Sequence, residues 1–108
     1  MGFDDFSDRT APEWCEEAAT IIRERGLDYG DPRLNLLRIY KISRILGVQL
    51  RNPSELALIF LATKLSRIVE APAREDSYLD LLGYSAIFAQ LRFTSPDDWS
   101  DLDIDAEY

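Results

Sequence analysis

The sequence predicts an all-α fold, a small bundle of about four helices, and three observations lead to this prediction. Apolar residues recur every three or four positions through most of residues 10–94, as they do along one face of a helix. Capping residues, proline or glycine bound each of these segments. No segment alternates apolar and polar residues as a half-buried strand does. The chain has 108 residues, which suits one domain with one modest core.

The first helix is expected from Thr10 to about Arg25. Thr10 and Glu13 form a capping box with a proline in the first turn, and Gly26 supplies a C-cap. Cys15 is expected to be a small core residue on this helix. The apolar face is expected to consist of Trp14, Ala18, Ile21 and Ile22.

The second helix is expected to begin at Asp31-Pro32 and to end near Leu46, because Gly47 follows. Asp31 is the expected N-cap residue, and proline favours the first helical position. The candidate core residues of this helix are Leu36, Leu37, Tyr40 and Ile45.

The third helix is expected to start at a second capping box, Asn52-Pro-Ser-Glu55, and to reach about Glu70. It is apolar on nearly all sides, which predicts the most buried helix of the bundle. The fourth helix is expected from about Asp76 to Phe93.

The net charge of −8 is concentrated at the two ends of the chain. Residues 1–9 carry −2 and residues 95–108 carry −6, while the 11 acids and 11 bases of residues 10–94 cancel. We therefore expect an acidic arm, a balanced helical domain and an acidic tail. The sequence has no stripe of basic residues that would favour direct binding to nucleic acid. It also has no apolar run long enough to span a membrane. The acidic start lacks the features of a signal peptide, so a cytoplasmic protein is expected.

The absence of histidine and the single cysteine limit the chemistry. They exclude a disulfide within the chain, cysteine and histidine metal sites, and nucleophile systems that rely on histidine. Any catalysis would use carboxylates, lysine, tyrosine or an oxygen-bound metal such as Mg²⁺.

Lys64 is the most informative single residue, because it lies within the apolar third helix. A buried ammonium group needs a partner, and Asp80 is the best candidate. One interpretation is a purely structural Lys64–Asp80 bridge between the third and fourth helices. The alternative is a ligand pocket in which Lys64 and Arg67 contact phosphate, while Asp76 and Asp80 hold Mg²⁺ or a ribose hydroxyl. Tyr84 lies on the same face of the fourth helix as Asp76 and Asp80, since the three residues are at i, i+4 and i+8.

The segment Tyr29–Asn35 is a further candidate for the rim of a pocket. Asp31 is negative and caps the helix start, which makes the segment a poor phosphate cradle. A plain capping role explains Asp31, but it does not explain Tyr29 or Asn35. We therefore keep Tyr29, Asp31 and Asn35 as candidate ligand-binding residues.

Three motifs in order resemble a family of small phage helical proteins. They are YGDPxxN at residues 29–35, NPSELALIFLATKLSR at 52–67 and DSYLDLLGYSA at 76–86. The family pattern is similar, with YGDPxxN, then a segment ending LKxAR, then DSWxDxxGY. The resemblance covers most of residues 13–90, and it implies an uncharacterised helical family.

A more distant resemblance links the chain to the all-α nucleoside triphosphate pyrophosphohydrolases of the MazG type. It implies a helical bundle that oligomerises and binds Mg²⁺ through E-E-x-x-E on one helix and E-x-x-D on the next. Asp80 matches the last position of the second motif, Ser77 replaces its glutamate, and Asp76 is one step away. The first motif is not matched, since the third helix offers only Glu55 before Lys64.

The sequence therefore gives two main functional hypotheses. The first is a phage-type, homo-oligomeric protein of the host cytoplasm that binds a nucleotide or signalling nucleotide and sequesters or hydrolyses it. The alternative is a phage accessory or anti-defence protein that inhibits a host protein by direct binding, without a small-molecule ligand. A third hypothesis is a structural oligomer in which Lys64–Asp80 is only a bridge.

Overall fold

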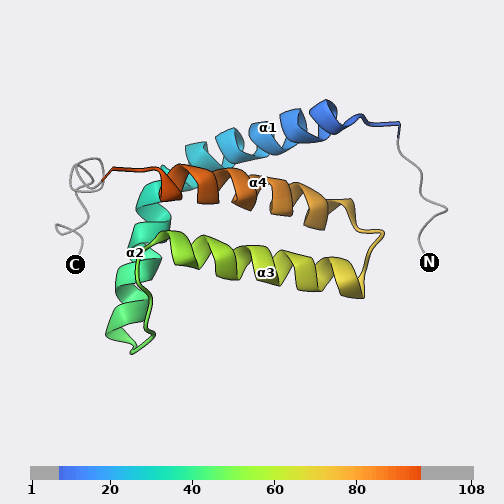
Figure 1. Ribbon diagram of the computed structural model, residues 1–108. Coiled ribbons are helices and arrows are strands. Elements are labelled where there is room, and N and C mark those ends of the chain that lie inside the picture. Colours follow the sequence, from blue (N-terminus) through green and yellow to red (C-terminus); the bar gives the residue numbers. More distant parts are fainter. Residues whose placement is uncertain (1–7, 96–108) are drawn as a thin grey trace.

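A computed structural model describes residues 8–95, and over this range the chain forms four helices and no strand. This confirms the predicted all-α bundle. None of these helices is long and apolar enough to cross a membrane. The predicted acidic tail and most of the acidic arm lie outside the described residues. The helices are α1 (Ala11–Tyr29), α2 (Pro32–Ile45), α3 (Ser54–Glu70) and α4 (Glu75–Arg92) (Figure 1).

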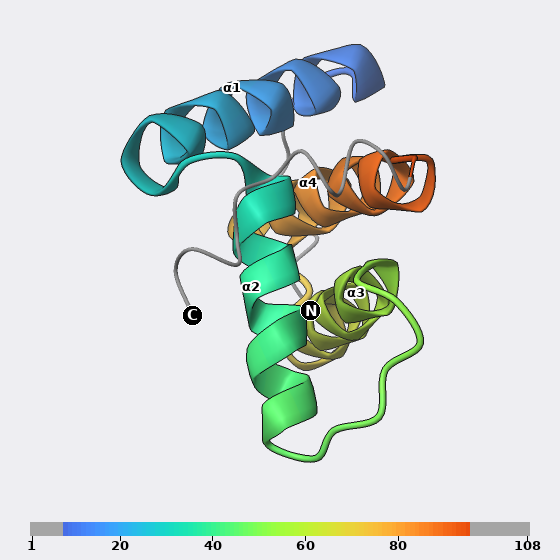
Figure 2. The same cartoon turned by 90° about the vertical axis from the view of Figure 1, so that its left-hand side faces the viewer.

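Three of the helices form a row. In both views α4 lies between α1 and α3, and α2 runs across the end of the row where α1 ends and α3 begins (Figures 1 and 2). α4 packs against all three other helices, whereas α1 and α3 do not pack on each other. A Cβ atom at Gly83 would lie 3.7 Å from the Ile22 side chain, so α4 comes close to α1 there.

The best buried apolar cluster lies where α2 crosses α3 and α4. Leu36, Leu56, Ala57 and Leu91 form this cluster. Leu36 and Leu37 confirm two of the predicted core positions of α2. The partly buried residues around the cluster include Ile39, Tyr40, Phe60 and Phe88.

The end of α1 differs from the prediction. The helix does not stop at Arg25. It continues through Gly26 to Tyr29, and Gly30 is the C-cap with a φ of 84°. The Gly30 amide donates to the Gly26 carbonyl oxygen at 2.9 Å. Gly30 tolerates the positive φ at no steric cost, which makes it the better stop signal, while Gly26 is accommodated inside the helix.

Two of the three predicted helix N-caps are confirmed. Thr10 and Glu13 form the capping box of α1. Asp31 caps α2, accepting a hydrogen bond from the Arg33 amide at 2.9 Å. The predicted capping box of α3 is wrong.

At the start of α3, Pro53 occupies the N-cap position. The Asn52 carboxamide oxygen accepts a hydrogen bond from the Ser54 amide instead. Glu55 accepts one from the amide of Arg51, one residue before the predicted partner. These two side chains therefore order the turn before the helix.

Three predictions of burial are wrong. Cys15 is exposed, because it lies one position outside the Trp14–Ala18–Ile22 face. Ile45 is 79% exposed at the far end of α2, beyond the cluster around Leu36. α3 is not the most buried helix, because Leu58, Ile59, Leu65 and Val69 are all exposed.

Candidate functional site

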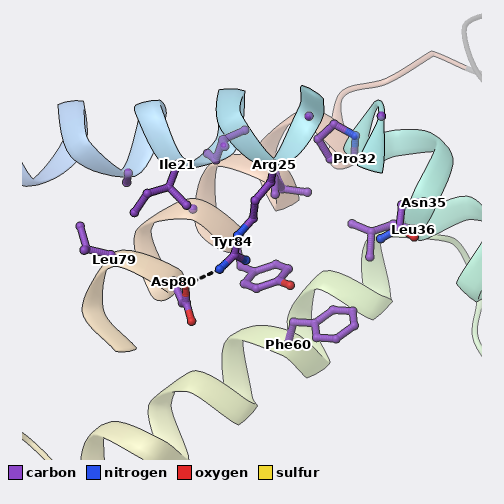
Figure 3. Close-up of a pocket in the computed structure, with 15 residues that line it drawn as sticks. Ile21, Arg25, Pro32, Asn35, Leu36, Phe60, Leu79, Asp80 and Tyr84 are labelled. Atoms are coloured by element: carbon purple, nitrogen blue, oxygen red, sulfur yellow. Dashed lines mark ion pairs between the residues drawn. The ribbon is translucent and has the colours of Figure 1, made fainter. Parts of the chain in front are cut away.

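A pocket of about 450 Å³ lies between α1, α2 and α4, with Phe60 of α3 closing one side (Figure 3). Its walls are mainly apolar. Ile21 and Ile22 come from α1, Leu36 from α2, and Ile87 from α4. The polar side chains in its lining are few, and they approach from different helices.

The polar end of the pocket is built around Asp80. The Lys64 ammonium nitrogen lies 2.9 Å from one Asp80 carboxylate oxygen, and these side chains are only 13% and 19% exposed. The ion pair that the sequence predicted is therefore present. A guanidinium nitrogen of Arg25 lies 3.8 Å from the other Asp80 oxygen (Figure 3). Two cations therefore share one carboxylate, so this end of the pocket has a net charge of +1.

Aromatic rings adjoin the charged group. The rings of Phe60 and Tyr84 stack with centroids 5.1 Å apart and planes inclined by 13°. The Lys64 ammonium lies 5.9 Å from the centroid of the Tyr84 ring. Tyr84 thus lines the pocket beside the ion pair, as the sequence pattern of α4 indicated.

The other end of the pocket comes from the segment Tyr29–Asn35. Gly30, Pro32 and Asn35 line the pocket, and Figure 3 places Asn35 next to Leu36 at this end. The Asn35 carboxamide offers both a donor and an acceptor to a ligand. The sequence prediction that this segment forms a rim agrees with this geometry.

Asp31 does not line the pocket. Its carboxylate accepts hydrogen bonds from the Arg33 guanidinium, with the shortest distance 2.8 Å, and from the Arg33 amide. These contacts lower the pKa of the Asp31 carboxyl below its usual value, against the opposing effect of partial burial. Asp31 therefore positions the start of α2, and with it Asn35 one turn later.

Lys64, Arg67 and Asp76 are not in the described pocket lining, although Lys64 pairs with Asp80, which does line the pocket. Arg67 is exposed on α3, and Asp76 is exposed in the first turn of α4. Tyr29 is the last residue of α1, and its side chain is outside what the structure describes. The structure thus groups Lys64, Asp80, Tyr84 and Asn35, and it leaves Arg67 and Asp76 apart from them.

A metal centre needs several converging ligands. Among residues 8–95, no three acidic or cysteine side chains come together as they would around a metal ion. Asp80 is the only carboxylate in the described lining of the pocket, and it is already paired with Lys64. This arrangement suits the binding of an anion better than the binding of Mg²⁺ by the protein alone.

Sequence reasoning missed Arg25 and Gly26. Both line the pocket, on a turn of α1 that was expected to be the end of the helix. A Cβ atom at Gly26 would meet nothing within 4 Å, so helix packing does not require glycine there. The usable signal was spacing. Arg25 is four residues after Ile21 and three after Ile22, and it therefore shares their face.

The chain was compared with known protein families, curated proteins and solved structures. The model of the DUF6378 family, a domain of unknown function, matches residues 13–92. No curated protein and no solved structure matches the chain. The matched range spans all of α2, α3 and α4 and most of α1, and so includes every element that lines the pocket.

Proposed function

The chain belongs to the DUF6378 family, and we propose that its pocket binds a nucleotide or nucleotide-derived ligand. The observation that carries the proposal is the composition of the pocket. An apolar and aromatic wall leads to Arg25 and Asp80, and Lys64, outside the lining, pairs with the same Asp80 carboxylate. A ligand with a flat ring and an anionic group would fit, because the ring would pack on the apolar wall and the anion would contact the cationic end.

The size and lining of the pocket support a ligand of this class. The volume of about 450 Å³ lies in the range of small-molecule pockets, which are mostly apolar with a few converging polar groups. In our proposal the ring packs beside Tyr84 and hydrogen-bonds to Asn35. The phosphate then contacts Arg25. The Arg25 side chain is 58% exposed, and its distance of 3.8 Å from Asp80 is long for an ion pair. Arg25 is therefore free to turn towards an anion while Lys64 keeps Asp80 paired.

We propose binding or sequestration rather than hydrolysis as the activity. A two-metal pyrophosphohydrolase holds its metals with several carboxylates, and the described pocket lining supplies one. Any Mg²⁺ at the site would therefore arrive bound to the nucleotide. A phage-type protein that sequesters a nucleotide in the host cytoplasm is consistent with the motif resemblance at residues 29–35, 52–67 and 76–86.

A thermal-shift screen of nucleotides and cyclic nucleotides, each with and without Mg²⁺, tests the proposal. A ligand that binds only the folded state stabilises it by about 2.7 kcal/mol at 100 times its Kd. This corresponds to a rise in Tm of roughly 10 °C or more for a domain of this size. A screen in which no compound raises the Tm would end the nucleotide proposal.

The role of Arg25 has a matched control on the same helix. Arg25→Gln removes the pocket cation, while Arg23→Gln removes an exposed arginine that does not line the pocket. We expect Arg25→Gln to weaken binding of a hit compound about tenfold or more, the effect of one charge-assisted hydrogen bond. Arg23→Gln should bind as the wild type does. Equal affinities of the two variants, measured by calorimetry, would remove Arg25 from the site.

Gly26 provides an independent test of the pocket. Gly26→Ala replaces glycine inside a helix, where alanine is more stable by roughly 0.5–1 kcal/mol. The added methyl group has room, but it protrudes into the pocket. We expect a higher Tm for the free protein together with weaker ligand binding. A variant that is both more stable and equally able to bind would show that the ligand lies elsewhere.

A second candidate function rests on the charge distribution. The described domain is close to neutral, while residues 95–108 carry −6. A host-protein inhibitor could use these acidic residues to attract a basic partner. Deletion of residues 95–108 separates the two functions. Nucleotide binding should survive the deletion, whereas inhibition through the tail should not.

A further inference from the structure

The side of the helix row away from the pocket is apolar and uncovered. On α3, Leu58, Ala62, Leu65 and Val69 are exposed and are spaced four, three and four residues apart, so they lie along one side of the helix. Lys64 and Phe60 lie on another side, facing Asp80 and Tyr84 of α4. None of the four exposed residues lines the pocket.

α4 extends this surface with small side chains. Ser85 and Ala89 are exposed, and Leu82 is half-buried, at spacings of three and four residues. None of the three lines the pocket, and Ser85 lies about a quarter of a turn or more from every pocket position of α4, while Leu82 borders the pocket residue Leu79. We call the combined surface the α3–α4 face. It consists of Leu58, Ala62, Leu65 and Val69 of α3 and Leu82, Ser85 and Ala89 of α4.

The fold leaves this face without a second layer. α2 crosses the end of the row and contributes Asn35 and Leu36 to the pocket (Figure 1). It therefore leaves Leu58, Leu65 and Val69 of α3 exposed. Domains normally consist of at least two packed layers around a core. Among residues 8–95, no large side chain is completely buried, and Val69 is 84% exposed. The described core is therefore incomplete at the α3–α4 face.

We propose that the α3–α4 face binds the same face of a second copy of the chain, forming a four-helix bundle across a two-fold axis. The seven residues of the face are uncharged, with the exposed Arg92 at the end of its α4 stripe, and they combine large and small side chains, as a self-complementary helix surface requires. The pairing buries the exposed leucines and valine of both copies. The pockets lie on the outer sides of the dimer and remain accessible.

The area of the face is close to that of a stable dimer interface. A helix of this length extends about 25 Å, and two helices packed about 10 Å apart present a face of roughly 500 Å² in projection. The accessible area of a corrugated helix surface exceeds its projection. It therefore approaches the roughly 800 Å² per partner of a stable protein–protein interface.

The charge distribution favours a second copy over a basic partner protein. A basic partner would be attracted to the acidic ends of the chain, whereas the α3–α4 face is neutral. Two copies of net charge −8 repel each other, and added salt screens this repulsion. Dimerisation through the neutral face should therefore strengthen with salt, while binding of a basic partner should weaken.

Sedimentation of the full-length chain tests the proposal. We expect a particle of twice the 12.4 kDa chain mass, with a dissociation constant that falls as NaCl is raised from about 0.05 to 0.5 M. A monomer at 100 μM in all salt concentrations would overturn the proposal. Binding of a different protein to the α3–α4 face of a monomer would also overturn the proposal.

Two variants and a matched control locate the interface. Val69→Glu changes a side chain that is 84% exposed, so the monomer should fold normally, and Leu65→Glu changes the centre of the face. Leu27→Glu introduces the same charge at an 88% exposed leucine of α1 that lies outside the face. We expect the first two to weaken the dimer at least tenfold, and Leu27→Glu to leave it unchanged. Circular dichroism confirms that each variant is folded. A dimer that survives both substitutions in folded protein would contradict the proposal.

Discussion

Two ion pairs of nearly equal length have very different surroundings. Asp31 and Arg33 are 2.8 Å apart at the start of α2, and their side chains are 36% and 27% exposed. Lys64 and Asp80 are 2.9 Å apart between α3 and α4, and they are 13% and 19% exposed. The first pair joins residues two positions apart, while the second joins two helices. Distance alone therefore does not distinguish a local cap from a tertiary contact.

The two pairs differ in the stability that the fold loses when one partner of the pair is removed. Water can solvate Asp31 or Arg33 if its partner is removed, so the cost is mainly the lost helix cap. Lys64 and Asp80 have little access to water, and either one alone would be a poorly solvated charge. The buried pair also borders the pocket, which ties its integrity to ligand binding. The predictions below separate these contributions, beginning with the largest effect.

The single substitution Asp80→Leu should have the largest effect on stability. It leaves the Lys64 ammonium poorly solvated and unpaired, since the second cation, Arg25, repels it. We expect a loss of about 3 kcal/mol in the free energy of unfolding. Urea denaturation followed by circular dichroism measures this change. A loss below about 1 kcal/mol would mean that water reaches Lys64 more freely than its exposure indicates.

The double substitution Lys64→Met with Asp80→Leu should recover most of that loss. Replacing a buried ion pair by apolar residues of similar volume is often neutral or stabilising. The result also separates the two interpretations of the pair. If the pair is only a bridge, the folded double variant binds nucleotide as the wild type does. Our proposal expects weaker binding, because Arg25 loses the Asp80 carboxylate that orients it in the pocket. A stable double variant that still binds would assign the pair a purely structural role.

The sequence predicted the features that depend on local chemistry and periodicity. The four helices, the capping of α1 by Thr10 and of α2 by Asp31, and the Lys64–Asp80 pair all follow from such patterns. The pair could be predicted because a lysine on an apolar helix needs a carboxylate, and Asp80 was the candidate among similarly apolar neighbours.

The features that depend on tertiary placement could not be read from the sequence. Gly26 resembles a helix stop, but Gly30 four residues later supplies a competing one. Extending α1 by one turn is what places Gly26 inside the helix, where it lines the pocket next to Arg25. The apolar pattern of α3 predicts burial, but it does not say whether another helix or a second chain covers it. Leu65 belongs to this apolar pattern, and yet it is 51% exposed on the described surface.

Asp31→Ala should have a smaller effect than Asp80→Leu. It removes the N-cap of α2 and the contact with Arg33, and loss of a cap costs about 1 kcal/mol. Because α2 carries Asn35, looser anchoring of its first turn should also weaken ligand binding slightly. Urea denaturation and calorimetry measure the two effects. A larger stability loss than that of Asp80→Leu would reverse the proposed ranking of the two ion pairs.

The charge of Asp31 should give the smallest effect, which depends on pH. Folding lowers the pKa of Asp31, because the Arg33 guanidinium and amide donate to its carboxylate. The ionised group therefore stabilises the fold fully above its unfolded pKa of about 3.9, and this contribution disappears as the pH falls through the lower folded pKa. Asp31→Asn retains a capping side chain but has no such titration.

The measurement is the difference in unfolding free energy between the wild type and Asp31→Asn, followed from pH 6 downwards. We expect the wild type to be more stable at pH 6 and the difference to shrink below about pH 4. Asp28→Asn is the control, since it removes an exposed carboxylate three residues away that caps no helix. A difference that stays constant across this range would show that Asp31 stabilises α2 through its cap geometry alone. In that case the short distance to Arg33 adds no electrostatic stability, and the contrast with the buried Lys64–Asp80 pair becomes sharper.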